Sequence, residues 1–175
     1  IRRFVSSQGG AFILSEQTKC NDWGCYYNQR DSNWGKKFIG SSSENMADVG
    51  CLATSVAMIL SHYNKKVTPA DIASTLDAFV PGTAYMWYRP WSVNGVTVIR
   101  SSQLISTTVI DDELQAGRPV IVGLYSGPGH FIVLKSGSNG NYIMNDPFLE
   151  NGSDVSFNSK YNVSNITEVD KISIN

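Results

Sequence analysis

Cys51-Leu-Ala-Thr-Ser-Val-Ala-Met-Ile-Leu-Ser-His-Tyr63 is the stretch of sequence on which the fold prediction depends. It contains neither glycine nor proline, and Asn64 with the two lysines after it suits the C-terminal end of a helix. Its larger apolar residues recur at helical spacing, at Leu52, Val56, Ile59, Leu60 and Tyr63. We therefore expect a helix that begins at Cys51, directly after Gly50.

Two shorter helices are predicted further along the chain. Thr68-Pro-Ala-Asp71 offers a threonine N-cap, a proline at the first helical position and an acid at the third. The apolar face of this second helix would carry Ile72, Leu76 and Phe79. A short third helix is expected over residues 112–116, ending at Gly117.

Apolar, β-branched runs of strand length follow in the C-terminal half. They cover residues 119–124, 130–134 and 142–145, and a Ser-Asn-Gly-Asn turn precedes the last one. Helices first and paired strands later indicate an α+β fold, with a helical half packed against one side of an antiparallel sheet. The tail from Asn151 to Asn175 is polar and adds no recognisable motif.

Length and composition suit one domain. The chain has 175 residues, of which 42% are hydrophobic, so a wholly disordered chain is excluded. We expect a single domain over residues 1–175, with residues 1–22 as a candidate N-terminal arm. The formal net charge is −1, so the composition gives no sign of the excess positive charge that is typical of proteins that bind nucleic acid or an anionic membrane. No run approaches the roughly 20 apolar residues needed to span a bilayer.

Two of the three cysteines, Cys20 and Cys25, enclose a short loop. They form either a disulfide in an oxidising compartment or two ordinary thiols. A zinc site is not favoured, because neither His62 nor His130 has ligand spacing to this pair. We expect no metal and no cofactor.

The third cysteine, Cys51, is a candidate nucleophile. Unpaired N–H groups at a helix start stabilise a thiolate, and Gly50 would leave the approach to its sulfur open. The alternative is a small buried residue, as most free cysteines are. A catalytic thiolate needs a general base, and His62 lies roughly 16 Å away along the same helix. His130 is therefore the candidate general base. The alternative interpretation of His130 is a buried structural histidine.

Two further residues complete a candidate catalytic set. Asp146 ends the strand that follows the one begun by His130, so a hairpin would bring the two together and let the carboxylate orient the imidazole. Its alternative is an ordinary Asp-Pro turn. The Gln29 side-chain amide is a candidate donor to an oxyanion, beside the backbone N–H of Cys51. Its alternative is a surface glutamine.

Taken in order, these segments resemble a known family. They are Tyr26-Tyr-Asn-Gln-Arg-Asp-Ser-Asn-Trp34, Val49-Gly-Cys-Leu-Ala-Thr-Ser-Val-Ala-Met58, Gly129-His-Phe-Ile-Val-Leu134 and Asn145-Asp-Pro147, over roughly residues 25–150. The pattern is similar to that of C39-like peptidases, which are papain-fold cysteine peptidases. The resemblance implies Cys51 as nucleophile, His130 as base, Asp146 as its orienter and Gln29 as the oxyanion residue. One departure is Leu52-Ala53, where family members usually have Gly-Pro or Gly-Ala after the cysteine.

The leading hypothesis is a thiol hydrolase that cleaves peptide or other amide bonds. The alternatives are a cell-wall amidase or endopeptidase of a related papain-like family, acting on peptidoglycan peptide, and a non-catalytic papain-fold binding module. Trp87 and Trp91 lie in an aromatic cluster that is either a substrate-binding wall or internal packing. We expect a monomer that acts on peptide or protein substrates. The low charge, the Ser- and Asn-rich sequence, the Cys20/Cys25 pair and the first residue, Ile1, favour a secreted or surface protein of a bacterium.

Overall fold

The fold of this chain is built on a seven-stranded antiparallel sheet. The structure is a computed structural model, and it describes residues 10–126 and 129–175. The strand order is β3-β4-β9-β5-β6-β7-β8. The strands are β3 (Trp91–Val93), β4 (Val96–Gln103), β5 (Val120–Leu124), β6 (His130–Ser138), β7 (Asn141–Asn145), β8 (Val155–Ser156) and β9 (Ile166–Ile174). A separate hairpin pairs β1 (Lys19–Asn21) with β2 (Gly24–Tyr26).

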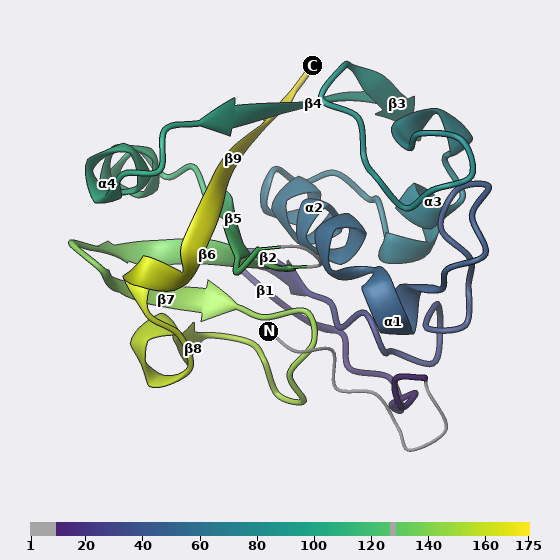
Figure 1. Ribbon diagram of the computed structural model, residues 1–175, viewed down its shortest axis with the longest axis horizontal. Helices are drawn as coiled ribbons and strands as arrows, with labels where there is room; N and C mark the ends of the chain where they lie inside the picture. The colour runs from purple at the N-terminus through teal and green to yellow at the C-terminus, as the bar shows by residue number, and fades with distance from the viewer. Residues whose placement is uncertain (1–9, 127–128) are drawn as a thin grey trace.

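Helices lie on both faces of the sheet (Figure 1). The described helices are α1 (Met46–Val49), α2 (Cys51–His62), α3 (Pro69–Ala73) and α4 (Thr107–Gln115), with short 3-10 turns at Leu76–Ala78, Phe157–Ser159 and Val163–Asn165. Ile121 and Val133 pack in the same apolar cluster as α2, whereas their strand neighbours Val122 and Ile132 pack in the cluster of α4. The α+β class is confirmed, but α4 departs from the expected placement of helices on one side.

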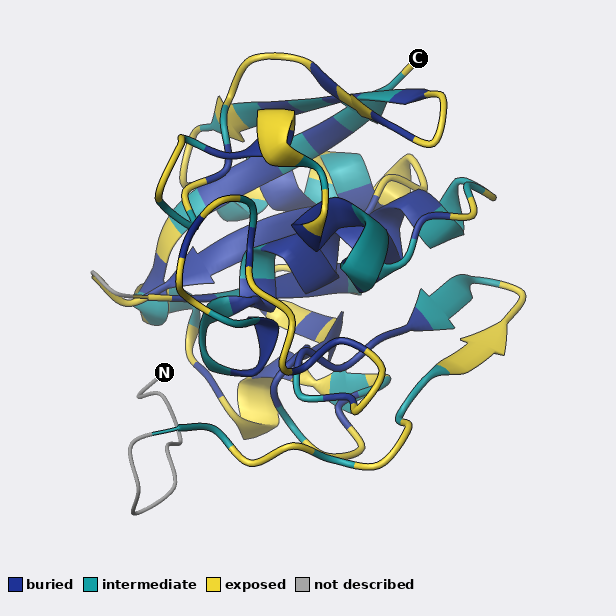
Figure 2. Ribbon diagram, turned by 90° about the vertical axis from the view of Figure 1, so that its right-hand side faces the viewer, coloured by how far each residue is buried: buried dark blue, intermediate teal, exposed yellow. Residues whose placement is uncertain are grey.

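Helix α2 begins at Cys51 as predicted. Its residues from Ala53 to Leu60 are all buried (Figure 2), and Ser61 Oγ caps the last turn by donating to Met58 O at 2.6 Å. The predicted threonine cap of α3 is confirmed as well, because Thr68 and Asp71 form a capping box. This helix ends early, at Ala73, and Leu76 is 63% exposed. The chain turns there into a 3-10 segment, so Leu76 lies off the apolar face on which we placed it.

The β6–β7 hairpin follows the predicted turn. Ser138 pairs with Asn141, and the two residues between them, Asn139 and Gly140, have positive φ angles of 51° and 87°. Two positive φ angles are what a two-residue hairpin turn of the type I′ class requires. This hairpin brings the start of β6 back toward the segment that follows β7.

The C-terminal tail corrects the sequence interpretation. Residues 166–174 form β9, which pairs with both β4 and β5 and so lies inside the sheet. Val169 and Ile172 are buried on its two faces, whereas Thr167 is exposed. Polar residues between the apolar ones hid this strand, because its pattern differs from the continuous apolar runs of β5 and β6.

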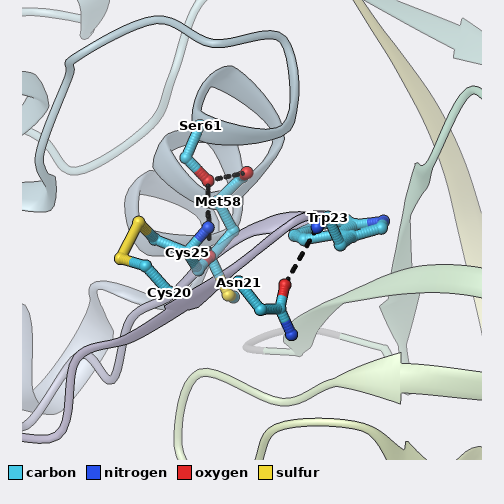
Figure 3. Close-up of a disulfide and its surroundings, with 6 residues drawn as sticks. All are labelled: Cys20, Asn21, Trp23, Cys25, Met58 and Ser61. Carbon is cyan, nitrogen blue, oxygen red and sulfur yellow. Dashed lines mark hydrogen bonds between the residues drawn. A yellow bond between two sulfur atoms is a disulfide. The ribbon is translucent and has the colours of Figure 1, made fainter.

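A disulfide closes the β1–β2 hairpin against the end of α2 (Figure 3). Cys20 and Cys25 are paired across the hairpin with an S–S distance of 2.08 Å. The Cys25 N–H donates to Ser61 Oγ at 2.8 Å. At Gly24 a Cβ would lie 2.8 Å from His62 N, so only glycine allows this close approach. Strand β2 then runs directly into the segment that holds Gln29.

Residues 10–18 are joined by hydrogen bonds to α1 and to the segment after β2. Ala11 N–H donates to Asp48 Oδ1 at 2.6 Å, and Leu14 N–H donates to Arg30 O at 2.8 Å. Of the candidate arm at residues 1–22, residues 1–9 lie outside the described part of the chain, and residues 19–21 belong to β1. Among the described helices, none is long and apolar enough to cross a membrane.

Candidate active site

A cleft of about 900 Å³ opens where α2 begins. Its lining comes from α1, the first turn of α2 and residues 80–88. The ends of β5 and β6 and part of β9 complete the lining. Gln29, Cys51 and His130 all line this cleft, and Asp146 lies behind His130. The fold thus brings together the four residues that the sequence singled out.

Cys51 is the free cysteine of the described chain, and it is buried. Gly50 before it is needed for packing: a Cβ there would lie 2.5 Å from Met46 O. This packing need adds to our expectation that Gly50 keeps the approach to the sulfur open, which stays a prediction. The absent side chain lets α1 and α2 meet at a sharp corner, which fixes where the first turn of α2 points.

His130 is held between Cys51 and Asp146. Its Nε2 lies 2.8 Å from Asp146 Oδ1, and its ring also forms a side-chain hydrogen bond with Cys51. Because Nε2 is taken by the carboxylate, Nδ1 is the ring nitrogen that is left for the sulfur. Asp146 Oδ1 also accepts from the Phe148 N–H at 2.9 Å, and its Oδ2 accepts from the Tyr161 hydroxyl.

These contacts shift the pKa values of all three groups. Burial alone would raise the pKa of the Cys51 thiol, but His130 and the N–H groups of Phe131 and Leu52 lower it below its ordinary value. Burial opposes the imidazolium of His130, yet Asp146 and Cys51 raise its pKa from 6.5 to about 9. The pKa of Asp146 is lowered despite its burial, because His130, Tyr161 and Phe148 stabilise the carboxylate. The arrangement therefore favours a thiolate–imidazolium pair near neutral pH.

Gln29 is buried and belongs to a segment that is bonded to the chain after β7. Its N–H donates to Pro147 O at 2.7 Å, and its side-chain Nε2 donates to Ala47 O at 3.0 Å. Its Oε1 is buried without a hydrogen-bond partner among the described residues. Gln29 is therefore not the surface glutamine of the alternative interpretation. Its amide sits at the cleft beside α1.

The sequence analysis missed three residues that build this site. Tyr161 contacts the Asp146 carboxylate, Tyr26 donates to Asp146 O at 2.8 Å, and Asn28 donates to Leu149 O at 2.8 Å. No motif marks Tyr161, which lies in the tail that we considered uninformative. Tyr26 and Asn28 lie next to Gln29 in the sequence, so the resemblance covered them without giving them a role.

The two tryptophans are placed differently. Trp87 is half-buried and lines the cleft, together with Tyr85 and Tyr88. Trp91 is only 4% exposed and packs in the apolar core with α2, so its interpretation as a substrate-binding residue is corrected to internal packing. Over the described residues, no group of three or more His, Cys, Asp or Glu side chains is placed to hold a metal ion.

A comparison with protein families identifies the family of this chain. The model of the Peptidase_C39 like family matches residues 25–168, a span that includes Gln29, Cys51, His130 and Asp146. A comparison with curated proteins finds no match.

The shifted pKa of Cys51 predicts rapid alkylation in mild acid. An ordinary thiol with a pKa of about 8.5 is almost entirely protonated at pH 6. The lowered pKa of Cys51 leaves more thiolate at that pH, and His130, whose pKa is raised to about 9, stays charged beside it. Iodoacetamide should label Cys51 at pH 6 at least roughly tenfold faster than it labels glutathione. In His130→Ala the rate at pH 6 should fall toward that of glutathione. Equal rates for the wild-type protein and glutathione would contradict a lowered thiol pKa.

Proposed function

The chain belongs to the C39-like peptidase family, whose members are papain-like cysteine peptidases, and from that premise we propose that it hydrolyses peptide bonds through Cys51, His130 and Asp146. The observation that carries this proposal is the continuous chain of contacts from Asp146 through His130 to the Cys51 sulfur. A structural histidine would need no buried carboxylate on one ring nitrogen and a thiol on the other. A binding module would need neither.

In the proposed reaction, the Cys51 thiolate attacks the carbonyl carbon of the scissile bond, and a sulfur–carbon bond forms. The carbonyl oxygen becomes an oxyanion. As the tetrahedral intermediate collapses, the carbon–nitrogen bond breaks and His130 gives its proton to the leaving amine. Water, deprotonated by His130, then attacks the thioester and releases the acid, which returns Cys51 to the thiolate. Asp146 keeps the imidazole in one tautomer and orientation throughout.

Gln29 is our candidate for stabilising the oxyanion. A side-chain amide has two N–H donors, and Ala47 O accepts one of them at 3.0 Å. The contact from the same nitrogen to Met46 O is longer, at 3.4 Å, so the second N–H is weakly engaged and free to serve a stronger acceptor. The backbone N–H of Cys51, in the first turn of α2, is the second proposed donor.

We also propose that the protein acts outside the cytoplasm. The Cys20–Cys25 disulfide supports this, since such bonds persist in oxidising compartments.

Replacement of Cys51 tests the proposed function directly. Cys51→Ala and Cys51→Ser should lose hydrolysis of a peptide substrate by several orders of magnitude, because no other group is placed to form the acyl intermediate. Ser92→Ala, an exposed change in β3, is the control and should keep full turnover. Circular dichroism checks that all variants fold. Unchanged turnover in folded Cys51→Ala would end the thiol-hydrolase proposal.

Gln29→Ala should separate binding from chemistry. An oxyanion donor acts on charge that appears only after attack, so its loss should lower kcat by about 100- to 1,000-fold and raise KM much less. Alkylation of Cys51 at pH 6 should persist, since the thiolate–imidazolium pair does not depend on the amide. Gln115→Ala, an exposed glutamine of α4, is the matched control. A near-normal kcat in Gln29→Ala would assign the oxyanion role to another group.

The disulfide proposal is tested by counting thiols. In protein purified without reductant and then denatured, a chromogenic disulfide reagent should titrate one free thiol per chain, that of Cys51. Prior reduction should raise the count to three. Three free thiols in the non-reduced protein would show that Cys20 and Cys25 are not bonded, which would remove this support for an extracellular location. The catalytic proposal would be unaffected.

A further inference from the structure

A buried arginine sits in the wall of the cleft opposite α2. Arg100 of β4 donates from Nε to Asp170 Oδ2 at 2.7 Å and from Nη2 to Glu168 Oε1 at 2.8 Å. Its Nη1 donates to Met86 O at 3.0 Å, and its guanidinium lies 4.2 Å from the ring centre of Tyr88. Every nitrogen of Arg100 is therefore engaged, and the residue is not available to an anionic substrate.

This network carries more negative than positive charge. One guanidinium faces two carboxylates, so the three groups sum to −1 when both acids are ionised. Burial first, and then the nearby Glu168, raise the pKa of Asp170 to about 7, although Arg100 opposes that shift. The two carboxylates also share a side-chain hydrogen bond, which needs a proton on one of them and helps to raise the pKa of Asp170. When both acids are ionised, that proton is gone and the network carries an uncompensated negative charge.

The exposed side of this network faces the cleft. The Glu168 side chain is 25% exposed and lines the cleft, whereas that of Asp170 is fully buried. Arg100 and the Tyr88 hydroxyl both donate to Glu168 Oε1, so the carboxylate is fixed in position at the cleft. Of the other charged residues in the lining, Glu44 and Asp48 are also acids. Arg100 is the lining's one Lys or Arg among the described residues, and it is already paired.

Strand register places Glu168 two strands away from the residue that follows His130. Glu168 pairs with Gly123, and Gly123 pairs with Phe131, the residue after His130. Two strand spacings of about 4.8 Å put Glu168 roughly 10 Å from the backbone of Phe131. An extended peptide advances about 3.3–3.6 Å per residue, so this distance suits a long side chain within one or two residues of the cleaved bond.

We propose that Glu168 is a specificity-determining residue that binds a lysine or arginine side chain of the peptide substrate. An ammonium or guanidinium group would donate to Glu168 Oε2 and complete the charge balance of the network. The methylenes of such a side chain would pack along the neighbouring ring of Tyr88. This inference rests on the proposed peptidase function, because it names the substrate class for the same cleft.

The test compares peptides that differ at one residue. Internally quenched peptides carrying lysine, norleucine or glutamate near the scissile bond are offered at pH 8, above the pKa of Asp170. The wild-type protein should cleave the lysine peptide with a kcat/KM roughly tenfold or more above that of the norleucine peptide, and the glutamate peptide worst. In Glu168→Gln the lysine-to-norleucine ratio should fall to near 1, with norleucine cleavage retained. Asp112→Asn, which changes an exposed acid of α4 outside the cleft lining, should keep the wild-type ratio.

The outcomes separate this inference from the proposed function. No preference in the wild-type protein, or a ratio unchanged in folded Glu168→Gln, would overturn the role of Glu168 while peptide hydrolysis stands. If no peptide is cleaved, the proposed function fails. Fluorescence anisotropy of the same peptides on Cys51→Ala then decides about Glu168, because the lysine peptide should still bind roughly tenfold tighter than the norleucine peptide. Equal binding, or no binding, would refute the subsite.

Discussion

The buried carboxylate of Asp146 is the group on which the rest of the site depends. An ionised carboxylate without contact to water is very costly unless it is hydrogen-bonded and paired with a charge. Here the His130 ring, the Phe148 N–H and the Tyr161 hydroxyl all donate to it. These donors come from β6, from the loop after β7 and from the segment before β9. The charge is stable only when those segments have met, so folding and assembly of the site are one event.

Helix α2 links this site to the opposite end of the molecule. Its first residue is Cys51, and its last turn supports the disulfide hairpin through Ser61 (Figure 3). The hairpin leads into Tyr26 and Gln29, which bond to the loop after β7. The chain thus returns from the end of α2 to its beginning, and the disulfide restrains the segment that positions the Gln29 amide. The contacts of the hairpin with the last turn of α2 therefore help to position Gln29 near the first turn of α2.

The parts of the fold that the sequence predicted are those with strong local signals. Helix α2 has a clear period, β5 and the start of β6 are continuous apolar runs, and the β6–β7 turn is a Ser-Asn-Gly-Asn motif. Because the hairpin and the helix start were predicted, the meeting of Cys51, His130 and Asp146 could be predicted from them. Tyr161 could not, since it lies in an irregular segment between two 3-10 turns, where no local pattern marks it. The β4–β9 pairing joins segments far apart in the sequence, and Arg100 and Asp170 within it interrupt the apolar pattern that would have marked a buried strand.

Strand β9, which the sequence analysis did not predict, matters for the proposed function. Side chains on a strand alternate between faces, so Glu168, Asp170 and Ile172 share one face and Val169 takes the other. Ile172 packs in the core beside α2, Asp170 is buried against Arg100, and Glu168 reaches the cleft. One face of β9 thus contributes Ile172 to the apolar core, Asp170 to the charged network and Glu168 to the candidate substrate site. A substitution that removes the Asp170 carboxylate would leave Arg100 paired with Glu168 alone. The net charge around Glu168 would then change, although the substituted residue itself does not contact the substrate. The substrate charge preference that we propose for this cleft would therefore depend partly on residues inside the sheet.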